Sequence, residues 1–187
     1  MNQTPVAVYT STGYPEGGSV ENFVRMLCLG LNANDVSVEL VLVRGNISQN
    51  SCVKSSSRIN VRNLFFKKRV DHDIVNLIET VFIFFILHFA ILHDCLIKRI
   101  RIYILYGLEY PYYTFPFLLL RMIGVKAIRI VTDDYEHGTI APSLWKEPKW
   151  WLYKLQKKID KYLNGIVFVS YYLQKSALEV GMDSKKC

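Results

Sequence analysis

The chain has 187 residues, of which 51% are hydrophobic, 13% aromatic and 21% charged. It is too apolar for a disordered protein and too charged for a protein with many membrane spans, and its length suits a single domain. The net charge of +7 at pH 7 favours anionic partners, such as phosphorylated ligands, an acidic membrane surface or nucleic acid.

The cysteines and the start of the chain indicate a reducing compartment. The four cysteines form no C-x-x-C pair and have no histidines at zinc spacing, which argues against a metal site and against a secreted disulfide scaffold. No basic segment followed by a long apolar one opens the chain, so we expect no secretory signal. These features predict a cytosolic protein.

Short β-rich runs alternate with helical patterns, which predicts an α/β fold: a Rossmann-like parallel sheet flanked by helices. The first half contains a strand at 6–9, a helix from 19 to about 31, a strand at 36–43 and a weaker strand at 59–65. Residues 74–97 are the most apolar, but their uninterrupted run is shorter than the about 20 residues that a membrane span needs. We expect a helix buried against the sheet, with an interfacial segment as the alternative.

The second half repeats the alternation. It contains a strand at 100–106, a turn at Gly107, an apolar helix that ends at Gly124, and a strand at 125–131. Pro111 and Pro116 suit the start of that helix rather than its middle. A helix at 148–163, a strand at 165–169 and a helix at 171–180 follow. Ligands of such a sheet bind beyond the carboxyl ends of its strands, so the candidate loops are 10–18, 107–111, 132–143 and 170–171.

Two of these loops carry distinctive residues. Gly17 and Gly18 precede a helix start at Ser19, where free N–H groups and the positive end of the helix dipole suit an anion such as a diphosphate. The spacing matches neither G-x-G-x-x-G nor a P-loop, and a tight strand-to-helix turn would need the same glycines. Loop 132–143 is acidic and contains a histidine: its members are Asp133, Asp134, Glu136 and His137.

Carboxylates in that loop could accept hydrogen bonds from sugar hydroxyls or transfer protons. Loop solvation and helix capping are the alternative. The chain contains no Ser-His-Asp order and no H-E-x-x-H pattern.

The predicted helix at 148–163 is basic and rich in tryptophan. One face carries Trp151, Leu155, Ile159 and Tyr162, another carries Lys154, Lys157 and Lys161, and Trp150 lies at the entrance. Such a helix could dock on anionic lipid, or it could pack its apolar face on the sheet as a solvated helix. No nucleic-acid-binding motif accompanies the charge, so we expect no nucleic-acid partner.

Four segments in order suggest a family. They are PEGGSVENFVRMLCLGL (15–31), ILYGLEYP (104–111), RIVTDDYEH (129–137) and, most specifically, IDKYLNGIVFVSYYLQKSALEVGMDSKK (159–186). Together they resemble the N-terminal domain of family 4 glycosyltransferases, a retaining group with the GT-B fold. The resemblance implies two Rossmann-like domains across a cleft, the N-terminal one mainly holding the acceptor and the C-terminal one the nucleotide sugar.

The resemblance also implies roles for particular residues. Gly17, Gly18 and Ser19 would meet the donor diphosphate. The acceptor side would be formed by Gly107, Glu109, His137 and Ser170, with Asp133 and Asp134 at the reacting centre. The nucleotide sugar is then a co-substrate, and no cofactor or metal need take part. Many family members have a histidine where this chain has Asp133, which puts the acceptor-side chemistry in question.

The chain ends where the family's linker to the second domain would begin. We therefore expect a truncated protein, a fragmentary gene product or one subunit of a split enzyme. Its function would be sugar transfer to a saccharide or lipid-linked acceptor in cell-surface polysaccharide or glycolipid synthesis, peripheral to the inner membrane face, with a separate C-terminal half. A non-catalytic module docking on a membrane or partner is the alternative. A dinucleotide enzyme is a third hypothesis, which the missing G-x-G-x-x-G disfavours.

Overall fold

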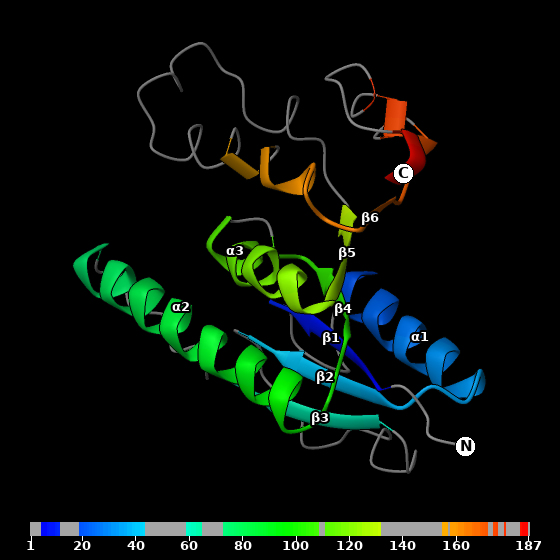
Figure 1. Cartoon of the computed structure of the whole chain (residues 1–187), viewed down its shortest axis with the longest axis horizontal. Coiled ribbons are helices and arrows are strands. Elements are labelled where there is room, and N and C mark those ends of the chain that lie inside the picture. Colours follow the sequence, from blue (N-terminus) through cyan, green and yellow to red (C-terminus); the bar gives the residue numbers. More distant parts are fainter. Residues whose placement is uncertain are drawn as a thin grey trace.

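The computed structural model describes residues 5–11, 19–43, 59–64, 73–108, 111–131, 155–156, 158–171, 174–175, 178 and 184–186. For residues 19–20, 73–80, 111–114 and 186 it describes the backbone alone. These residues form a six-stranded sheet in the order β3-β2-β1-β4-β5-β6, in which every pairing is parallel (Figure 1). The strands are β1 (Val6–Thr10), β2 (Val38–Leu42), β3 (Ile59–Asn63), β4 (Ile102–Tyr106), β5 (Lys126–Val131) and β6 (Gly165–Phe168). The predicted α/β class and all six predicted strands are confirmed.

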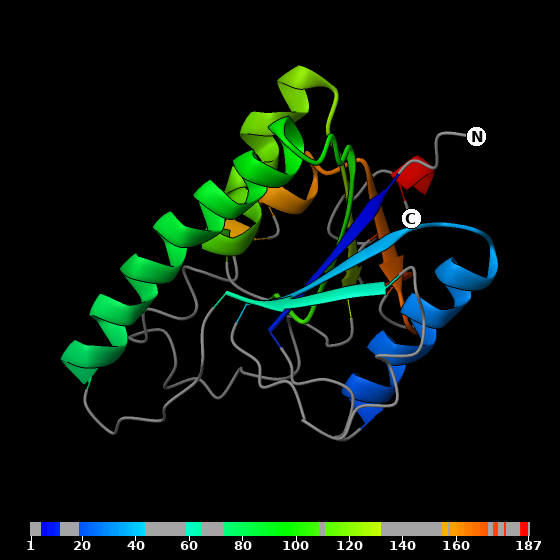
Figure 2. The same ribbon diagram turned by 90° about the horizontal axis from the view of Figure 1, so that it is seen from below.

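Helices cover both faces of the sheet. Helix α1 (Ser19–Ala33) lies on one face, whereas α2 (Asp73–Leu96) and α3 (Pro111–Leu120) lie on the other (Figure 2). Alternation along β1 explains the two layers: Val8 packs in the cluster that contains Val24 of α1, and Tyr9 packs in the cluster that contains Leu87 of α2. All five residues of β1 are buried, as expected for a central parallel strand.

A buried polar network joins α2 to the edge strand β3. Tyr9 donates a hydrogen bond of 2.7 Å from its hydroxyl to Oδ2 of Asp94, and Arg62 of β3 pairs with the same carboxylate oxygen. Burial and the neighbouring Asp94 charge raise the pKa of Tyr9 well above its ordinary value. Tyr9 therefore stays protonated and acts as a structural donor, not as a base.

The apolar helix after β4 differs from the prediction at one proline. Helix α3 begins at Pro111, as predicted, but Pro116 lies inside it. The prediction for Pro116 was wrong because residue 116 loses only the hydrogen bond it would donate to residue 112, while Phe117 and Leu120, next along the helix, are buried. A short 3-10 helix, η2 (Arg121–Ile123), follows, and Gly124 with φ of 80° ends it, as predicted.

The helix before β6 turns a different face to the sheet than its pattern predicts. Residues 155–156 and 158–160 are helical, with Ile159 buried. Leu155 and Tyr162, predicted to share the packing face with Ile159, are 47% and 62% exposed. The alternative in which the whole apolar face packs on the sheet is therefore wrong, because Asp160 is drawn inward to a buried arginine of β5.

Candidate functional site at the carboxyl edge of the sheet

The strand order places a topological switch point between β1 and β4. The chain runs outward from β1 to β2 and β3, and then returns to the other side of β1 to build β4, β5 and β6 (Figure 1). In open parallel sheets of this kind, ligands bind in the crevice outside the carboxyl ends of the strands at such a point. The residues that follow Thr10 of β1 and Tyr106 of β4 are therefore the centre of the candidate site.

Ser11 and Gly107 meet at this switch point. The Ser11 hydroxyl donates a hydrogen bond to the carbonyl oxygen of Gly107, joining the carboxyl ends of β1 and β4. Gly107 has a φ of 63°, a left-handed conformation, and the next residue, Leu108, is buried in the core. The predicted turn at Gly107 is confirmed, and the site begins from a fixed backbone. Sequence reasoning passed over Ser11, because one serine after a strand is a common loop residue.

Replacing Gly107 by Ala should lower the free energy of unfolding by about 1 kcal/mol, because a side chain strains the left-handed backbone there. Gly30 is the matched control: it lies in α1 with nothing within 4 Å of an added Cβ, so Gly30→Ala should stabilise by about 0.5–1 kcal/mol. Urea unfolding followed by circular dichroism measures both. An equal response of the two variants would contradict the strain at Gly107.

Helix α1 brings its amino end to the same edge. Because α1 follows β1 and runs back along the sheet, its first turn from Ser19 lies by the carboxyl ends of the strands, where its free N–H groups suit an anion. Phe23, in the next turn, stacks on Tyr106, the last residue of β4, with ring centroids 4.9 Å apart. This contact fixes the start of α1 against β4.

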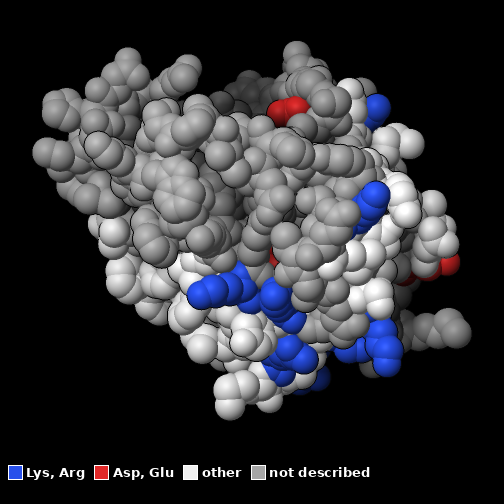
Figure 3. Space-filling model, turned by 90° about the horizontal axis from the view of Figure 1, so that it is seen from above, with Lys and Arg blue, Asp and Glu red and all other residues white. Residues whose placement is uncertain are grey.

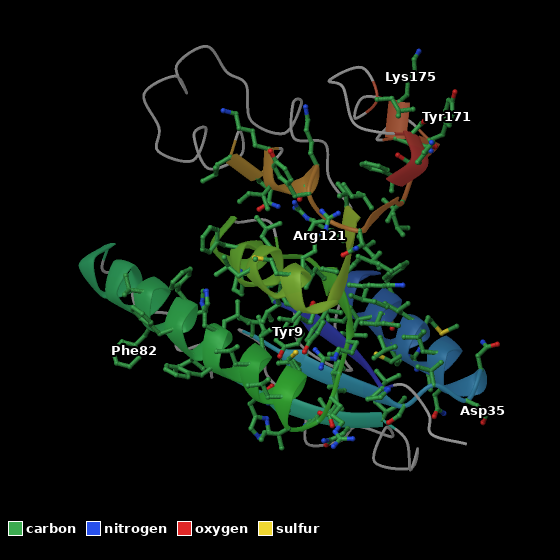
Figure 4. The ribbon with its side chains drawn as sticks, viewed as in Figure 1. Tyr9, Asp35, Phe82, Arg121, Tyr171 and Lys175 are labelled. Carbon is green, nitrogen blue, oxygen red and sulfur yellow. The ribbon has the colours of Figure 1, made fainter. Side chains whose placement is uncertain are left out.

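Ser170 lies at the carboxyl end of β6. Its carbonyl oxygen accepts a hydrogen bond of 3.2 Å from the backbone N–H of Gln174, so Ser170 precedes the first turn of a helix whose residue 171 is described (Figure 4). Gly107 and Ser170 follow β4 and β6, which are separated by β5, so both lie at the same edge of the sheet. Two helix amino ends thus share one edge with Gly107.

The other predicted site residues lie outside the described part of the chain. They are Gly17, Gly18, Glu109, Asp133, Asp134, His137, Trp150, Lys154 and Lys157. Ser19 is described as the first residue of α1 by its backbone alone. Lys161 is described and exposed. The roles proposed for these residues remain predictions.

A buried ion pair fixes the position of β6 beneath the edge. Nη1 of Arg129 on β5 lies 2.8 and 2.7 Å from the two carboxylate oxygens of Asp160. Gln156 donates a third bond of 2.6 Å to Asp160, and all three side chains are buried. Sequence reasoning missed this group. Its only signal was the three-to-four-residue spacing of Gln156, Asp160 and Leu163, all of which the structure buries.

Four further properties of the described residues bear on their function: surface charge, free cysteines, possible metal ligands and possible membrane spans. Basic side chains gather on the face in Figure 3, where acidic ones form separate spots, in keeping with the net charge of +7. Cys28 and Cys95 are free and buried, and burial raises the pKa of the Cys28 thiol to about 12. Within the described ranges, no His, Cys, Asp and Glu side chains form a group of three able to hold a metal ion. No described helix meets the length and hydropathy needed to span a bilayer.

The fold is shared with glycosyltransferases of known structure. A protein described as LpCGTa in complex with UDP superposes with a TM-score of 0.57 at 11% identity, over 98% of this chain and 51% of that one. A UDP-glucosyltransferase from Polygonum tinctorium capable of glucosylating indoxyl gives 0.54 at 12%, over 100% and 50%. A transferase from Siraitia grosvenorii in complex with UDP gives 0.52 at 13%, over 92% and 46%.

This chain therefore spans about half the length of those proteins, and its fold is that of one half of a GT-B structure. No protein-family model and no curated protein sequence matches the chain. The likeness supports a GT-B half but does not single out family 4.

Proposed function

We propose that the chain is the acceptor-side half of a glycosyltransferase. It would act on a nucleotide-sugar donor and a saccharide or lipid-linked acceptor in cell-surface polysaccharide or glycolipid synthesis. The observation that carries the proposal is the carboxyl edge: the Ser11–Gly107 contact and the start of α1 lie at the switch point of a fold shared with half of several glycosyltransferases. Two of those proteins are in complex with UDP.

The proposed mechanism assigns a donor side and an acceptor side to this edge. Gly17, Gly18 and the N–H groups from Ser19 onward would contact the donor diphosphate, where fixed N–H dipoles stabilise the charge that develops on the leaving group. The sugar would leave the nucleoside diphosphate through an oxocarbenium-like state. The acceptor would lie against Gly107, Glu109, His137 and Ser170, with Asp133 and Asp134 near its hydroxyl.

Two other functions share part of this evidence. The strand order 3-2-1-4-5-6 also occurs in dinucleotide-binding enzymes, but the chain lacks their G-x-G-x-x-G fingerprint. A non-catalytic docking module with the same fold would keep the Ser11–Gly107 contact without using it. The glycosyltransferase proposal is preferred because it gives the Gly17–Gly18 pair before α1 a ligand without requiring the missing fingerprint.

The test is to mix the chain with a candidate nucleotide-sugar-binding half, encoded next to or downstream of its gene, and to screen nucleotide sugars for hydrolysis or transfer. Activity that requires both polypeptides supports the proposal. A half that binds nucleotide sugar and associates with this chain, but shows neither reaction, favours the docking module. Binding of a dinucleotide by the isolated chain would favour the third hypothesis.

The basic helix before β6 predicts peripheral membrane binding. Leu155, Lys158, Lys161 and Tyr162 are exposed, so apolar and cationic groups both reach solvent there. Changing Lys154, Lys157 and Lys161 together to Glu should abolish sedimentation with anionic vesicles, since each cation near such a surface contributes about 1 kcal/mol. The control changes Lys175, Lys185 and Lys186 to Glu, an equal change of charge elsewhere. Equal sedimentation of the two variants would refute this dock.

A further inference from the structure

The outer face of α2 is apolar and uncovered among the described residues. From residue 81 to residue 97 the exposed side chains are Val81, Phe82, Phe85, Phe89, Leu92, His93, Leu96 and Ile97. Phe89 is 70% exposed and Ile97 71%, and His93 is the one polar member. Figure 4 shows Phe82 pointing away from the sheet. Exposed apolar side chains are common singly, but a continuous run indicates an interaction surface.

The apolar stripe has a regular geometry. Phe82, Phe85, Phe89, Leu92 and Leu96 recur at alternate spacings of three and four residues. That spacing keeps them on one side of the helix, along a line of about 21 Å at 1.5 Å per residue. The stripe can therefore contact a flat surface along its whole length.

Apolar and basic residues continue beyond the end of α2. Arg101 donates hydrogen bonds to Sγ of Cys95, near the end of α2, and to the carbonyl oxygen of Ile123 in η2, so these two elements lie side by side. Met122 is 90% exposed and Ile123 50%. Four exposed cations belong to the same end of the domain: Arg99, Arg101, Arg121 and Lys126.

No exposed carboxylate balances these cations among the described side chains from 81 to 131. Asp94 is the acidic residue described there, and it is buried against Arg62 and Tyr9. A second copy of the chain would have to supply carboxylates opposite the cations, and its own α2 face offers none among those side chains. A surface of anionic headgroups over acyl chains supplies both the negative charge and the apolar phase.

We propose that this α2 face, defined as the stripe Phe82, Phe85, Phe89, Leu92 and Leu96 with Ile97, Met122 and Ile123, docks on an anionic lipid surface. The helix lies in the plane of the interface, with its phenylalanine rings at the acyl boundary and Arg99 toward lipid phosphates. This surface is distinct from the basic helix before β6. It does not depend on the proposed glycosyltransferase function.

The test is sedimentation of the 187-residue chain with two kinds of vesicle. One contains phosphatidylcholine alone, and the other, the mixed vesicle, contains equal parts of phosphatidylcholine and phosphatidylglycerol. Phe85→Gln with Phe89→Gln should weaken binding to the mixed vesicles about tenfold or more, because two large apolar side chains are lost from the contact. The matched control is Met26→Gln with Leu29→Gln, which changes exposed apolar residues of α1 on the opposite face of the sheet. Circular dichroism checks that both variants are folded.

Binding of the wild-type chain to mixed vesicles, weaker binding to phosphatidylcholine, and a loss confined to the α2 variant would support the proposal. Arg99→Asn, which keeps a residue suited to positive φ, should weaken binding to the mixed vesicles and leave binding to phosphatidylcholine vesicles unchanged. Equal losses in the α2 and α1 variants would overturn the proposal. A wild-type chain that does not sediment, but forms a dimer that Phe85→Gln with Phe89→Gln dissociates, would assign the face to a second copy instead.

Discussion

Replacing Asp160 by Ala should lower the free energy of unfolding by about 3–5 kcal/mol, the largest stability loss that we expect from a single change. Arg129 is 3% exposed and would keep its charge in the interior after losing a carboxylate that lies 2.7–2.8 Å away. Gln156 would lose its acceptor at the same time. Urea unfolding followed by circular dichroism measures the loss.

A charge-free pair is the control for this prediction. Asp160→Leu combined with Arg129→Met removes both charges and keeps apolar volume, so the double variant should recover most of the stability that Asp160→Ala loses. If Asp160→Ala costs less than about 1 kcal/mol, water or another group satisfies Arg129, and the pair does not fix β6. The outcome also bears on the candidate site, because Ser170 follows β6 and its position depends on where β6 lies.

The layered sheet could be predicted because its information is local. The apolar run at 6–9 and the helical spacing that follows Ser19 indicate a buried strand and the helix after it, although the side chains of α1 that enter the core are Val24 and Cys28. The turn at Gly107 could also be predicted, because glycine commonly marks a left-handed backbone, and its φ is 63°. The positions of the elements followed from period and turn residues alone.

The buried polar pairs could not be predicted in the same way. Asp160 lies among lysines in the sequence and looks like a solvated helix residue, and Arg129 looks like the polar position of an alternating strand. Only the tertiary packing of the helix on β5 reveals that they meet. The same contact leaves Leu155 outward, although Leu155 shares the apolar face of the pattern with Ile159, which is buried.

Helix α2 shows a further limit of composition. Its high apolar content predicts burial, but a helix that lies on one face of a sheet can bury only the side chains on its inner side. Ile83, Leu87 and Ile91 fill that side, so Phe85 and Phe89 remain outside. An apolar segment therefore predicts a helix without telling how much of it is covered.

Gly18→Val should reduce sugar transfer about 100-fold in an enzyme assembled from this chain and a nucleotide-sugar-binding half. The proposal has the donor diphosphate approach the backbone directly before α1, and a β-branched side chain there would hold the phosphates away from the N–H groups. Initial rates at several donor concentrations measure the effect. The melting temperature of the variant checks that the fold is kept.

The control for this prediction lies in the same helix. Gly30→Ala adds a side chain far along α1, where an added Cβ meets nothing within 4 Å, so transfer should be unchanged. A fall in kcat/KM for Gly18→Val with normal acceptor KM would support a contact with the donor, because the acceptor is assigned to other loops of the edge. Unaltered transfer would remove Gly18 from the donor site and leave the Gly17–Gly18 pair as a strand-to-helix turn.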